Sequence, residues 1–456
     1  MTETATDVIV VGAGIAGLAA ARALAGTGLS TLVLEAHDRP GGRIHTVPEP
    51  SWPAPLEAGA EFVHGKPPSL LRLLEQAGLH VDAADGDRYV AEGGRLRDGR
   101  ALFDRVQSAL ASLRFDREQS VRARLAARDF RARTTPLERV LAIAFVEGFN
   151  AADADLASFA ALVQQTAAAK RISGDDFLGR VREGYGALVS ALARGTQLWL
   201  RTEVTEVRWR AGGVEVLARS PEGPVRATAR RALITLPLGV LQFSPPAQGA
   251  VVFVPPLPAW KRNAIASLAM GPVVKVALRF RDPPWRAVPA LHNLHFLHVP
   301  GAPFPTFWVP RPFDVPVLIA WAAGPAAVAL SGQAEALLVR AALRSLSSGL
   351  AREFPELIAS LEEATAFDWG TDPFSRGAYS WVPVGQLRRQ RTLALPVGDA
   401  LHFAGEATNW EGHCATVHGA LDSGLRAARE IAGNLRAVSG GKAHGHEADQ
   451  VPGGPR

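Results

Sequence analysis

A glycine-rich turn close to the amino terminus restricts the fold of this chain more than any other feature. The run VIVVGAGIAGLAAA places Gly12, Gly14 and Gly17 in the spacing GxGxxG. An apolar strand precedes the turn, an alanine-rich helix over 15–25 follows it, and a second apolar strand ends at Glu35. This order predicts a βαβ unit in a parallel sheet, and therefore an α/β fold.

Each glycine of the turn has its own physical task. Gly12 permits the tight turn, Gly14 lets the backbone approach a pyrophosphate, and Gly17 lets the helix pack against the strand. The phosphates would meet the helix N-terminus, where unpaired N–H groups and the helix dipole favour negative charge. Glu35 is placed to accept hydrogen bonds from ribose hydroxyls. The motif predicts a dinucleotide site, and by itself it does not separate FAD from NAD.

The chain of 456 residues is longer than one core usually supports, so we expect two domains. A hydrophobic content of 47% and a charged content of 20% are typical of a globular enzyme. Apolar residues recur at helical spacing over 101–146, whereas 198–216 and 273–280 have strand patterns. We expect a nucleotide-binding domain over 1–85, 195–245 and 390–436, a second domain over 86–194 and 246–389, and a disordered tail over 437–456.

Charge, cysteine content and hydropathy exclude several classes of function. The formal net charge is only +5 and the arginines are scattered, so we expect no nucleic-acid partner. Cys414 is the single cysteine, which excludes an intrachain disulfide and a multi-cysteine metal site, and we expect no metal and a reducing, cytoplasmic location. The apolar run over 315–330 is broken by Pro316, Gly324 and Pro325, so no membrane span is predicted. A strand that begins at Asp7 leaves no room for a signal peptide.

The segment EAHDRPGGRIHT, residues 35–46, narrows the choice of cofactor. Gly41 and Gly42 allow close backbone approach, and Arg43 offers planar donors to phosphate oxygens. This segment resembles the extended signature of the FAD-binding amine oxidase superfamily, which includes monoamine oxidases, polyamine oxidases and flavin lysine demethylases. The resemblance runs through five motifs from Val8 to about Ala432. It implies FAD, held in a Rossmann-like domain interleaved with an α+β substrate domain that has a mixed sheet flanked by helices.

The resemblance implies further cofactor contacts. In LEAGAEFVHG, residues 56–65, the family's strand passes beside the flavin ring, where Gly59 and Ala60 are small enough for a flat ring to lie against the backbone. The motif ITLPLGVL, residues 234–241, matches the return of the chain to the nucleotide domain. The remaining cofactor positions implied by the family are Glu61, Val204 beside adenine, Trp369 in the flavin site, Gly405 and Glu406 at the second FAD contact, and Val417 under the ring.

Four residues are candidates for contact with the substrate or for catalysis. Lys275 stands in the apolar strand GPVVKVALRF, where a buried ammonium costs several kcal/mol unless it is paired. Lys275 points outward from a half-exposed strand, or, as the resemblance implies, it reaches the flavin N5 through a water and assists reoxidation. His64 matches a position that binds the substrate amine, and a loop histidine is the alternative. Tyr379 matches one aromatic wall of the substrate cage, or it packs in the core. Thr416 lies at the second wall.

Two departures from the family pattern shape the expected function. Ala378 stands where monoamine oxidases attach FAD through a cysteine, so we expect non-covalent FAD. Thr416 replaces a second cage aromatic, which argues against small aromatic monoamines, and the chain has no space for the long helical insertion of the demethylases. The resemblance implies oxidation of a polyamine-like or other primary or secondary amine, by hydride transfer from its α-carbon to flavin N5, with O2 reduced to H2O2.

Three alternatives remain open from the residues alone. An L-amino-acid oxidase would need an arginine to clamp the substrate carboxylate, and the many arginines do not exclude it. A desaturase or porphyrinogen-type flavoenzyme shares the segment 12–46 and acts on apolar substrates. A flavin-binding scaffold without turnover is the non-enzymatic alternative. The oligomeric state is open.

Overall fold

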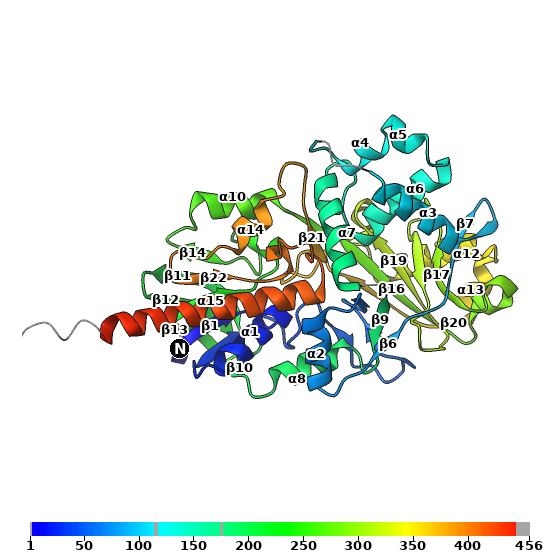
Figure 1. The fold of residues 1–456 in the computed structure, drawn as a ribbon. Coiled ribbons are helices and arrows are strands. Elements are labelled where there is room, and N and C mark those ends of the chain that lie inside the picture. Colours follow the sequence, from blue (N-terminus) through cyan, green and yellow to red (C-terminus); the bar gives the residue numbers. More distant parts are fainter. Residues whose placement is uncertain (1, 114–116, 174–176, 444–456) are drawn as a thin grey trace, which may run out of the picture.

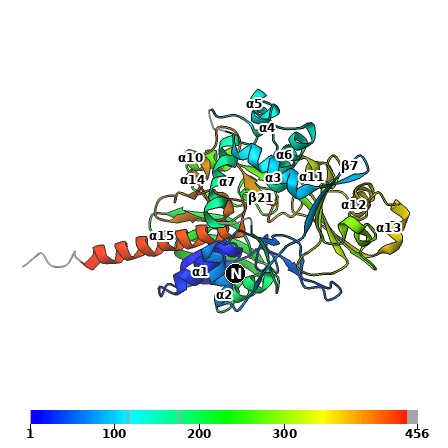
Figure 2. The same ribbon diagram turned by 45° about the vertical axis from the view of Figure 1, so that its right-hand side comes forward.

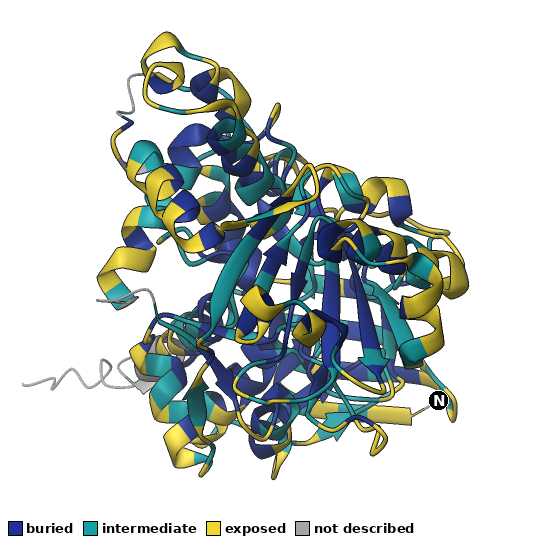
Figure 3. Cartoon of the chain, turned by 90° about the vertical axis from the view of Figure 1, so that its right-hand side faces the viewer, coloured by how far each residue is buried: buried dark blue, intermediate teal, exposed yellow. Residues whose placement is uncertain are grey.

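The computed structural model describes residues 2–113, 117–173 and 177–443. Two large sheets form the two halves of the molecule, and a group of helices covers the second half (Figure 1). Buried residues gather in the sheets and on the inward faces of the helices, and exposed residues lie on the outer helices and turns (Figure 3).

The first sheet has eight strands in the order β10-β2-β1-β13-β12-β11-β14, with β22 beside β13. Strands β1, β2, β10, β13 and β22 pair in parallel, and the hairpin β11–β12, whose connecting turn contains Gly212, extends the sheet in antiparallel fashion. Its members are β1 (Thr2–Val11), β2 (Thr31–Leu34), β10 (Leu198–Trp199), β11 (Glu203–Arg210), β12 (Gly213–Ser220), β13 (Gly223–Ile234), β14 (Val252–Val254) and β22 (Leu401–Phe403).

Helices cover both faces of this sheet, which explains the unbroken apolar sequence of β1. Val8 and Val10 pack under α1 (Ile15–Ala25), α8 (Tyr185–Ala193) and α15 (Val417–Ala443). Ile9 and Val11 pack on the other face, toward α10 (Ala259–Ser267) and α14 (Arg389–Ala394). Figures 1 and 2 show α15 lying beside α1 along this half. The predicted parallel sheet and the helix over 15–25 are confirmed.

The second sheet has seven strands in the order β20-β16-β19-β18-β17-β7-β8. It is mixed, because β7 and β17 pair in parallel whereas the other neighbours are antiparallel. Its members are β7 (Asp87–Glu92), β8 (Arg95–Asp98), β16 (Val273–Phe280), β17 (Leu294–His298), β18 (Thr306–Trp308), β19 (Val317–Ala323) and β20 (Leu361–Asp368). One face packs against α12 (Glu335–Leu350), together with α13 (Phe354–Ser360).

Separate helices form the layer predicted around 101–146, outside the nucleotide fold. They are α3 (Gly99–Ala111), α4 (Val121–Leu125), α5 (Arg128–Arg131), α6 (Pro136–Phe149) and α7 (Phe159–Ser173). Three small sheets join the halves and contain β3 (Thr46–Val47) with β4 (Leu56–Glu57), β15 (Ala269–Gly271) with β21 (Tyr379–Trp381), and β5 (Phe62–His64), β9 (Leu178–Val181) and β6 (Val81–Ala83). The described residues also form the short α-helices α2 (Pro68–Gln76), α9 (Leu238–Leu241) and α11 (Pro325–Leu330), and the 3-10 helices η1 (Pro284–Ala287), η2 (Pro289–Leu291) and η3 (Glu406–Thr408).

Some boundaries differ from the sequence-based expectations. The motif over 56–65 is not one strand, because residues 58–61 separate β4 from β5. Strand β14 pairs with β11 in the first sheet although 246–389 was expected to form the second domain. Helix α15 continues past the expected start of a disordered tail at 437, and residues 444–456 of that tail lie outside the described residues. No helix within the described ranges is long and apolar enough to cross a membrane.

Candidate functional site

The three glycines of the first turn occupy three different environments. A Cβ on Gly12, whose φ is +104°, would lie 2.7 Å from Thr235 Oγ1, and one on Gly17 would lie 2.1 Å from the Gly12 carbonyl oxygen. A Cβ on Gly14 would have no atom within 4 Å. Gly12 and Gly17 are therefore required by internal packing, whereas Gly14 faces open space at the start of α1, which has no side-chain cap on its N–H groups.

The glycine pair Gly41 and Gly42 lies directly beside this turn. The Gly41 amide donates to the Ala13 carbonyl at 2.8 Å, and Gly14 and Gly41 form an isolated parallel bridge. Gly42 has a φ of +57°, and a Cβ there would lie 3.6 Å from Gly14 Cα. The structure thus brings both sequence motifs to the uncapped end of α1, which is where phosphate groups bind favourably.

A cleft with about 660 Å³ of empty space, counted to its open mouth, runs along these loops. The predicted residues that line it are Gly12, Gly14, Glu35, Gly42, Arg43 and Val204. Sequence reasoning missed other lining residues, among them His37, Thr202, Thr235, Phe374 and Ser375. The combination of an open glycine, a helix N-terminus and an acid at the end of β2 fits a dinucleotide.

The Glu35 carboxylate faces the cleft and also accepts hydrogen bonds from within the protein. Its Oε2 accepts the Ala13 amide at 2.7 Å, and its Oε1 accepts the His37 amide at 2.9 Å and lies 3.2 Å from His37 Nδ1. His37 Nε2 lies 3.2 Å from Asp372 Oδ1. Burial alone would lower the His37 pKa, but hydrogen bonds and charges of Asp372 and Glu35 outweigh it and raise the pKa to about 9. His37 therefore joins the carboxylate that follows β2 to the segment that contains Phe374.

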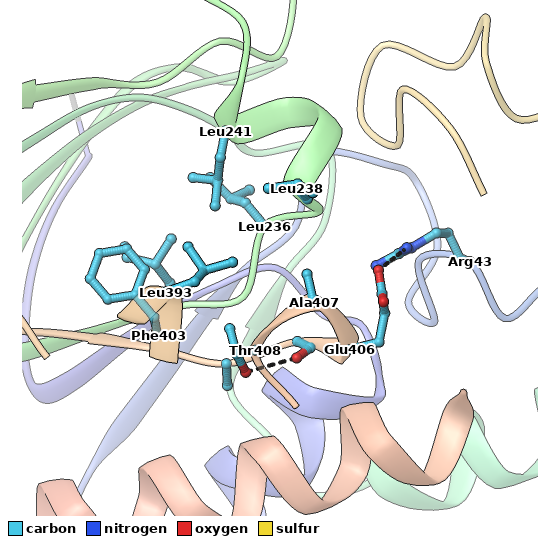
Figure 4. A pocket seen from close by; sticks show the side chains of 12 residues that line it. Arg43, Leu236, Leu238, Leu241, Leu393, Phe403, Glu406, Ala407 and Thr408 are labelled. Carbon is cyan, nitrogen blue, oxygen red and sulfur yellow. Dashed lines mark hydrogen bonds and ion pairs between the residues drawn. The ribbon is translucent and has the colours of Figure 1, made fainter. Parts of the chain in front are cut away.

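A second pocket, with about 290 Å³ of empty space, adjoins the cleft and shares Arg43 and Leu236 with it. Gly405 and Glu406 line it opposite a cluster of leucine side chains (Figure 4). The Glu406 carboxylate accepts from Arg43 Nη1 at 2.8 Å, from Ser380 Oγ at 2.6 Å and from the Ala415 amide at 3.0 Å. Both oxygens are thus bonded within the protein, and Glu406 holds Arg43 in place. A direct contact of Glu406 with FAD stays a prediction.

Gly59 packs tightly against other parts of the chain. A Cβ on Gly59 would lie 1.9 Å from the Arg43 carbonyl oxygen and 3.0 Å from Trp369 Cζ2, so the chain itself makes the close approach. The Ala60 amide donates to the same Arg43 carbonyl at 3.1 Å, and Trp369 Nε1 donates to the Ala58 carbonyl at 2.9 Å. Gly59, Ala60 and Trp369 are therefore one packed unit with the Arg43 backbone, and their contact with a flavin ring stays a prediction.

Lys275 is fully buried, which removes the outward-pointing alternative. Along β16, Val274, Val276 and Leu278 face α12, so Lys275 and Ala277 face the opposite side, toward residues 56–61. Lys275 Nζ donates to the Glu57 carbonyl and to Glu61 Oε2. Arg180, Lys275 and Trp308 donate to the two oxygens of the Glu61 carboxylate, and a contact of Glu61 with the cofactor stays a prediction.

The remaining candidates lie around Phe149 and the start of α15. Tyr379 donates its hydroxyl to the Phe149 carbonyl at 2.8 Å, and the His64 ring stands edge-on to the Phe149 ring at 5.4 Å. Burial lowers the His64 pKa to about 4, so this imidazole is neutral at physiological pH. Thr416 Oγ1 donates to the His413 carbonyl at 2.7 Å and accepts the Gly419 amide at 3.0 Å, and thereby supports the first turn of α15, where Val417 begins the helix.

The structure therefore brings many of the predicted residues together, and two of these groups lie along the cleft and around Phe149. The loops with Gly12, Gly14 and Gly42 meet Arg43 and Val204 along the cleft, and His64 meets Tyr379 through Phe149. Thr416 has no direct bond to His64 or Tyr379 among the contacts within the described residues. Phe149 gave no separate signal in the sequence, because it looks like an ordinary apolar position of α6. Within the described ranges, no three His, Cys, Asp or Glu residues are grouped so as to hold a metal ion.

Comparisons with known proteins agree on one family. The family model described as flavin containing amine oxidoreductase matches residues 15–432. Polyamine oxidase 4 of Oryza sativa subsp. japonica is 31% identical, over 93% of this chain and 88% of the relative. Polyamine oxidase 2 of Arabidopsis thaliana is 29% identical, over 94% and 89%. The lysine-specific histone demethylase 1 homolog 2 of Arabidopsis thaliana is 30% identical over 94% of this chain but only 58% of the relative.

Two kinds of solved structure have the same fold. Putrescine oxidase bound to putrescine matches with a TM-score of 0.76 at 24% identity, covering 94% of this chain and 99% of that one. Cyclohexylamine oxidase from Brevibacterium oxydans also gives a TM-score of 0.76, at 22% identity and the same coverage. At these identities the likeness establishes the fold, a Rossmann-like dinucleotide domain joined to a second domain with a mixed sheet, and not the substrate.

Proposed function

This chain belongs to the family of flavin-containing amine oxidoreductases, and from that membership we propose that it oxidises a polyamine-like or other primary or secondary amine. The cofactor is FAD, which we propose is held without a covalent bond. The overall reaction converts a CH–NH donor, O2 and water into a carbonyl compound, an amine or ammonia, and H2O2. The observation that carries the proposal is the cleft in which Gly14, Arg43 and Glu35 meet the uncapped N-terminus of α1.

The residues of the cleft would contact different parts of FAD. Gly14 leaves room for a pyrophosphate at the N–H groups of α1, and Arg43 supplies a positive charge that Glu406 keeps in place. Glu35 offers a carboxylate to the ribose, and Val204 lines the adenine end. When bound, FAD supplies a two-electron acceptor for a hydride at its N5.

The amine side of the proposed site combines a neutral imidazole with an aromatic wall. His64, with a pKa of about 4, carries no positive charge at physiological pH and therefore does not repel a cationic amine. The Tyr379 ring, fixed by its hydroxyl bond to the Phe149 carbonyl, offers its negative face to the same amine. Thr416 leaves this side of the proposed site less crowded than an aromatic residue would. We propose that these residues orient the amine, which must lose its ammonium proton before hydride transfer.

Two observations support non-covalent FAD. Ala378, in contact with Arg43 through its carbonyl at 2.8 Å, has no nucleophile for a covalent bond to flavin. The single cysteine, Cys414, is buried, its Sγ lies 2.9 Å from Gln165 Nε2, and burial raises its pKa to about 11. A thiol held in its neutral form is a poor nucleophile. A reducing, cytoplasmic location is part of the same proposal, since a single cysteine has no need of an oxidising compartment.

An anaerobic stopped-flow screen tests this function. The purified holoprotein is mixed with diamines and polyamines, with aromatic monoamines and with L-amino acids, and loss of the oxidised-flavin absorbance is followed. We expect rapid bleaching by a polyamine-like amine, followed in air by one H2O2 for each carbonyl formed. Bleaching by amino acids alone would make the protein an L-amino-acid oxidase, and bleaching by none of the amines would refute the proposal.

A matched pair of variants locates the amine. Tyr379→Phe keeps the aromatic face but loses the bond to Phe149, whereas Tyr379→Leu loses both. We expect the apparent amine affinity to fall more in the leucine variant than in the phenylalanine variant. Equal amine affinity in both variants would exclude Tyr379 as a wall of the substrate site. Colourless protein that gains no flavin spectrum on reconstitution with FAD would overturn the assignment of the cleft.

A further inference from the structure

A buried chain of charges surrounds Lys275. The Glu61 carboxylate lies between two cations, with Arg180 Nη1 at 2.5 Å from Oε1 and Lys275 Nζ bonded to Oε2. Trp308 Nε1 also donates to Oε1, at 2.6 Å. All three charged side chains are less than a tenth exposed. They come from three separate segments, namely residues 58–61, β9 and β16, so the tertiary fold alone brings them together.

The charges of this group do not balance. Arg180 is always protonated, so a charged Lys275 gives two cations for the single carboxylate of Glu61. Burial raises the Glu61 pKa, but the charges of Arg180 and Lys275 outweigh it and hold the pKa below its usual value, so Glu61 stays ionised. Burial is also the main influence on Lys275 and lowers its pKa, Glu61 opposes that effect, and Arg180 reinforces it. Lys275 is therefore the member of the group that loses a proton most readily as the pH rises.

The other ionisable groups near Lys275 do not restore the balance. Glu57 accepts the Tyr185 amide at 2.7 Å and the Thr46 hydroxyl at 2.8 Å, and burial raises its pKa to about 7. It therefore adds at most a partial negative charge near neutral pH. His295 on β17 faces Arg180 and Glu61, but burial lowers its pKa to about 3, so it is neutral. The proton on Lys275 thus depends chiefly on Glu61 and Arg180.

We propose that Glu61 is a positioning residue that keeps Lys275 protonated and in place, and that Arg180 acts on Lys275 in the opposite sense while anchoring Glu61. The proposal rests on the proposed function and on the role that the family resemblance implies for Lys275, which is to reach the flavin N5 through a water and assist its reoxidation by O2. Reduction of O2 to H2O2 consumes two electrons from the flavin and two protons. A protonated amine in a water-poor site stabilises the negative charge that O2 acquires. Lys275 Nζ donates to the Glu57 carbonyl and to Glu61 Oε2 and lies 5.5 Å from the centre of the Trp308 ring, so these groups fix the position of the ammonium.

Two variants test the proposal, because they should shift the pH at which Lys275 loses its proton in opposite directions. In Glu61→Gln the neutral amide no longer balances Lys275 and Arg180, so Lys275 loses its proton at lower pH. In Arg180→Met, the negative charge of Glu61 stabilises the Lys275 ammonium without a competing cation, so Lys275 keeps its proton to higher pH. A purely structural role predicts that both variants weaken the protein and move any pH profile alike, because each breaks the same buried bond.

The measurement needs no amine substrate, so it is independent of the proposed substrate. The holoprotein is photoreduced without oxygen and mixed with oxygenated buffer between about pH 6 and about pH 10, and the second-order reoxidation constant is measured at each pH. We expect the alkaline decline of this constant to move to lower pH in Glu61→Gln, with about a tenfold loss of rate on the declining limb for each pH unit moved. We expect it to move to higher pH in Arg180→Met.

Controls separate this role from general damage. Glu138, at the start of α6, is a buried carboxylate that lies 2.6 Å from Arg105. Glu138→Gln removes its charge and should leave the pH profile of reoxidation unchanged. In a Lys275→Met background, Glu61→Gln should have no further effect on reoxidation. Shifts of the same direction in Glu61→Gln and Arg180→Met, or a full effect of Glu61→Gln without Lys275, would overturn the proposal. If Glu61→Gln fails to bind FAD, Arg180→Met alone decides by the direction of its shift.

Discussion

Replacing His37 with glutamine should remove a contribution to stability that depends on pH. His37 bridges Glu35 and Asp372, each 3.2 Å from one ring nitrogen, and its pKa is raised from 6.5 to about 9. Because the folded-state pKa lies above the unfolded value, the contribution is fully present below about pH 6.5 and is lost as the pH rises through about 9. The difference corresponds to at most about 3 kcal/mol.

The measured loss of unfolding free energy in His37→Gln should be smaller than this upper bound. About a fifth of each side chain, 19% for His37 and 20% for Asp372, is open to solvent, which screens the pair, so we expect about 2 kcal/mol. A chain of 456 residues has an unfolding entropy of about 1 kcal/mol/K, so this loss lowers the midpoint of thermal unfolding by about 2 °C. The midpoint is measured by tryptophan fluorescence with FAD in excess, at about pH 6 and about pH 10.

His80→Gln is the matched control. His80 also pairs with a glutamate, Glu183 at 2.7 Å, but its side chain is 63% exposed, so its loss should change the midpoint by no more than a few tenths of a degree. The expected result is a difference between wild type and His37→Gln that is present at the lower pH and largely gone at the higher pH. A difference of the same size at both pH values would refute the reasoning, because it would arise from packing rather than from the charge of His37.

Four further predictions concern packing and titration. Gly59→Ala should lower stability by about 3 kcal/mol or more and weaken FAD binding in a fluorescence titration, because the new Cβ would lie 1.9 Å from the Arg43 carbonyl. Gly433→Ala, in α15 with no atom within 4 Å of the new Cβ, should instead stabilise by about 0.5–1 kcal/mol. Burial raises the Glu57 pKa from 4.5 to about 7, so the wild type loses stability as the pH rises between these values; Glu57→Gln should therefore gain on the wild type in thermal unfolding at about pH 8 relative to about pH 5. The buried thiol of Cys414, with a pKa near 11, should resist alkylation in the native protein near neutral pH and react after unfolding in urea, as followed by mass spectrometry.

The sequence by itself determined the nucleotide-binding half of this protein. The spacing of Gly12, Gly14 and Gly17 between an apolar strand and an alanine-rich helix is a local pattern, and local patterns fix backbone geometry within a few residues. The helix over 15–25, the strand over 273–280 and the family assignment followed from such patterns and are confirmed.

Only the tertiary structure decided which side chains meet. The alternation along β16 allows Lys275 to face either side of the sheet, and α12 on the other face decides that it is buried toward Glu61. Arg43 and Glu406 are 363 residues apart, and His37 and Asp372 are 335 apart. No period in the sequence relates such positions, because their contact results from the way the folded chain brings the ends of separate strands together. The charges that set the pKa of Lys275 and His37 therefore became visible only in the folded chain.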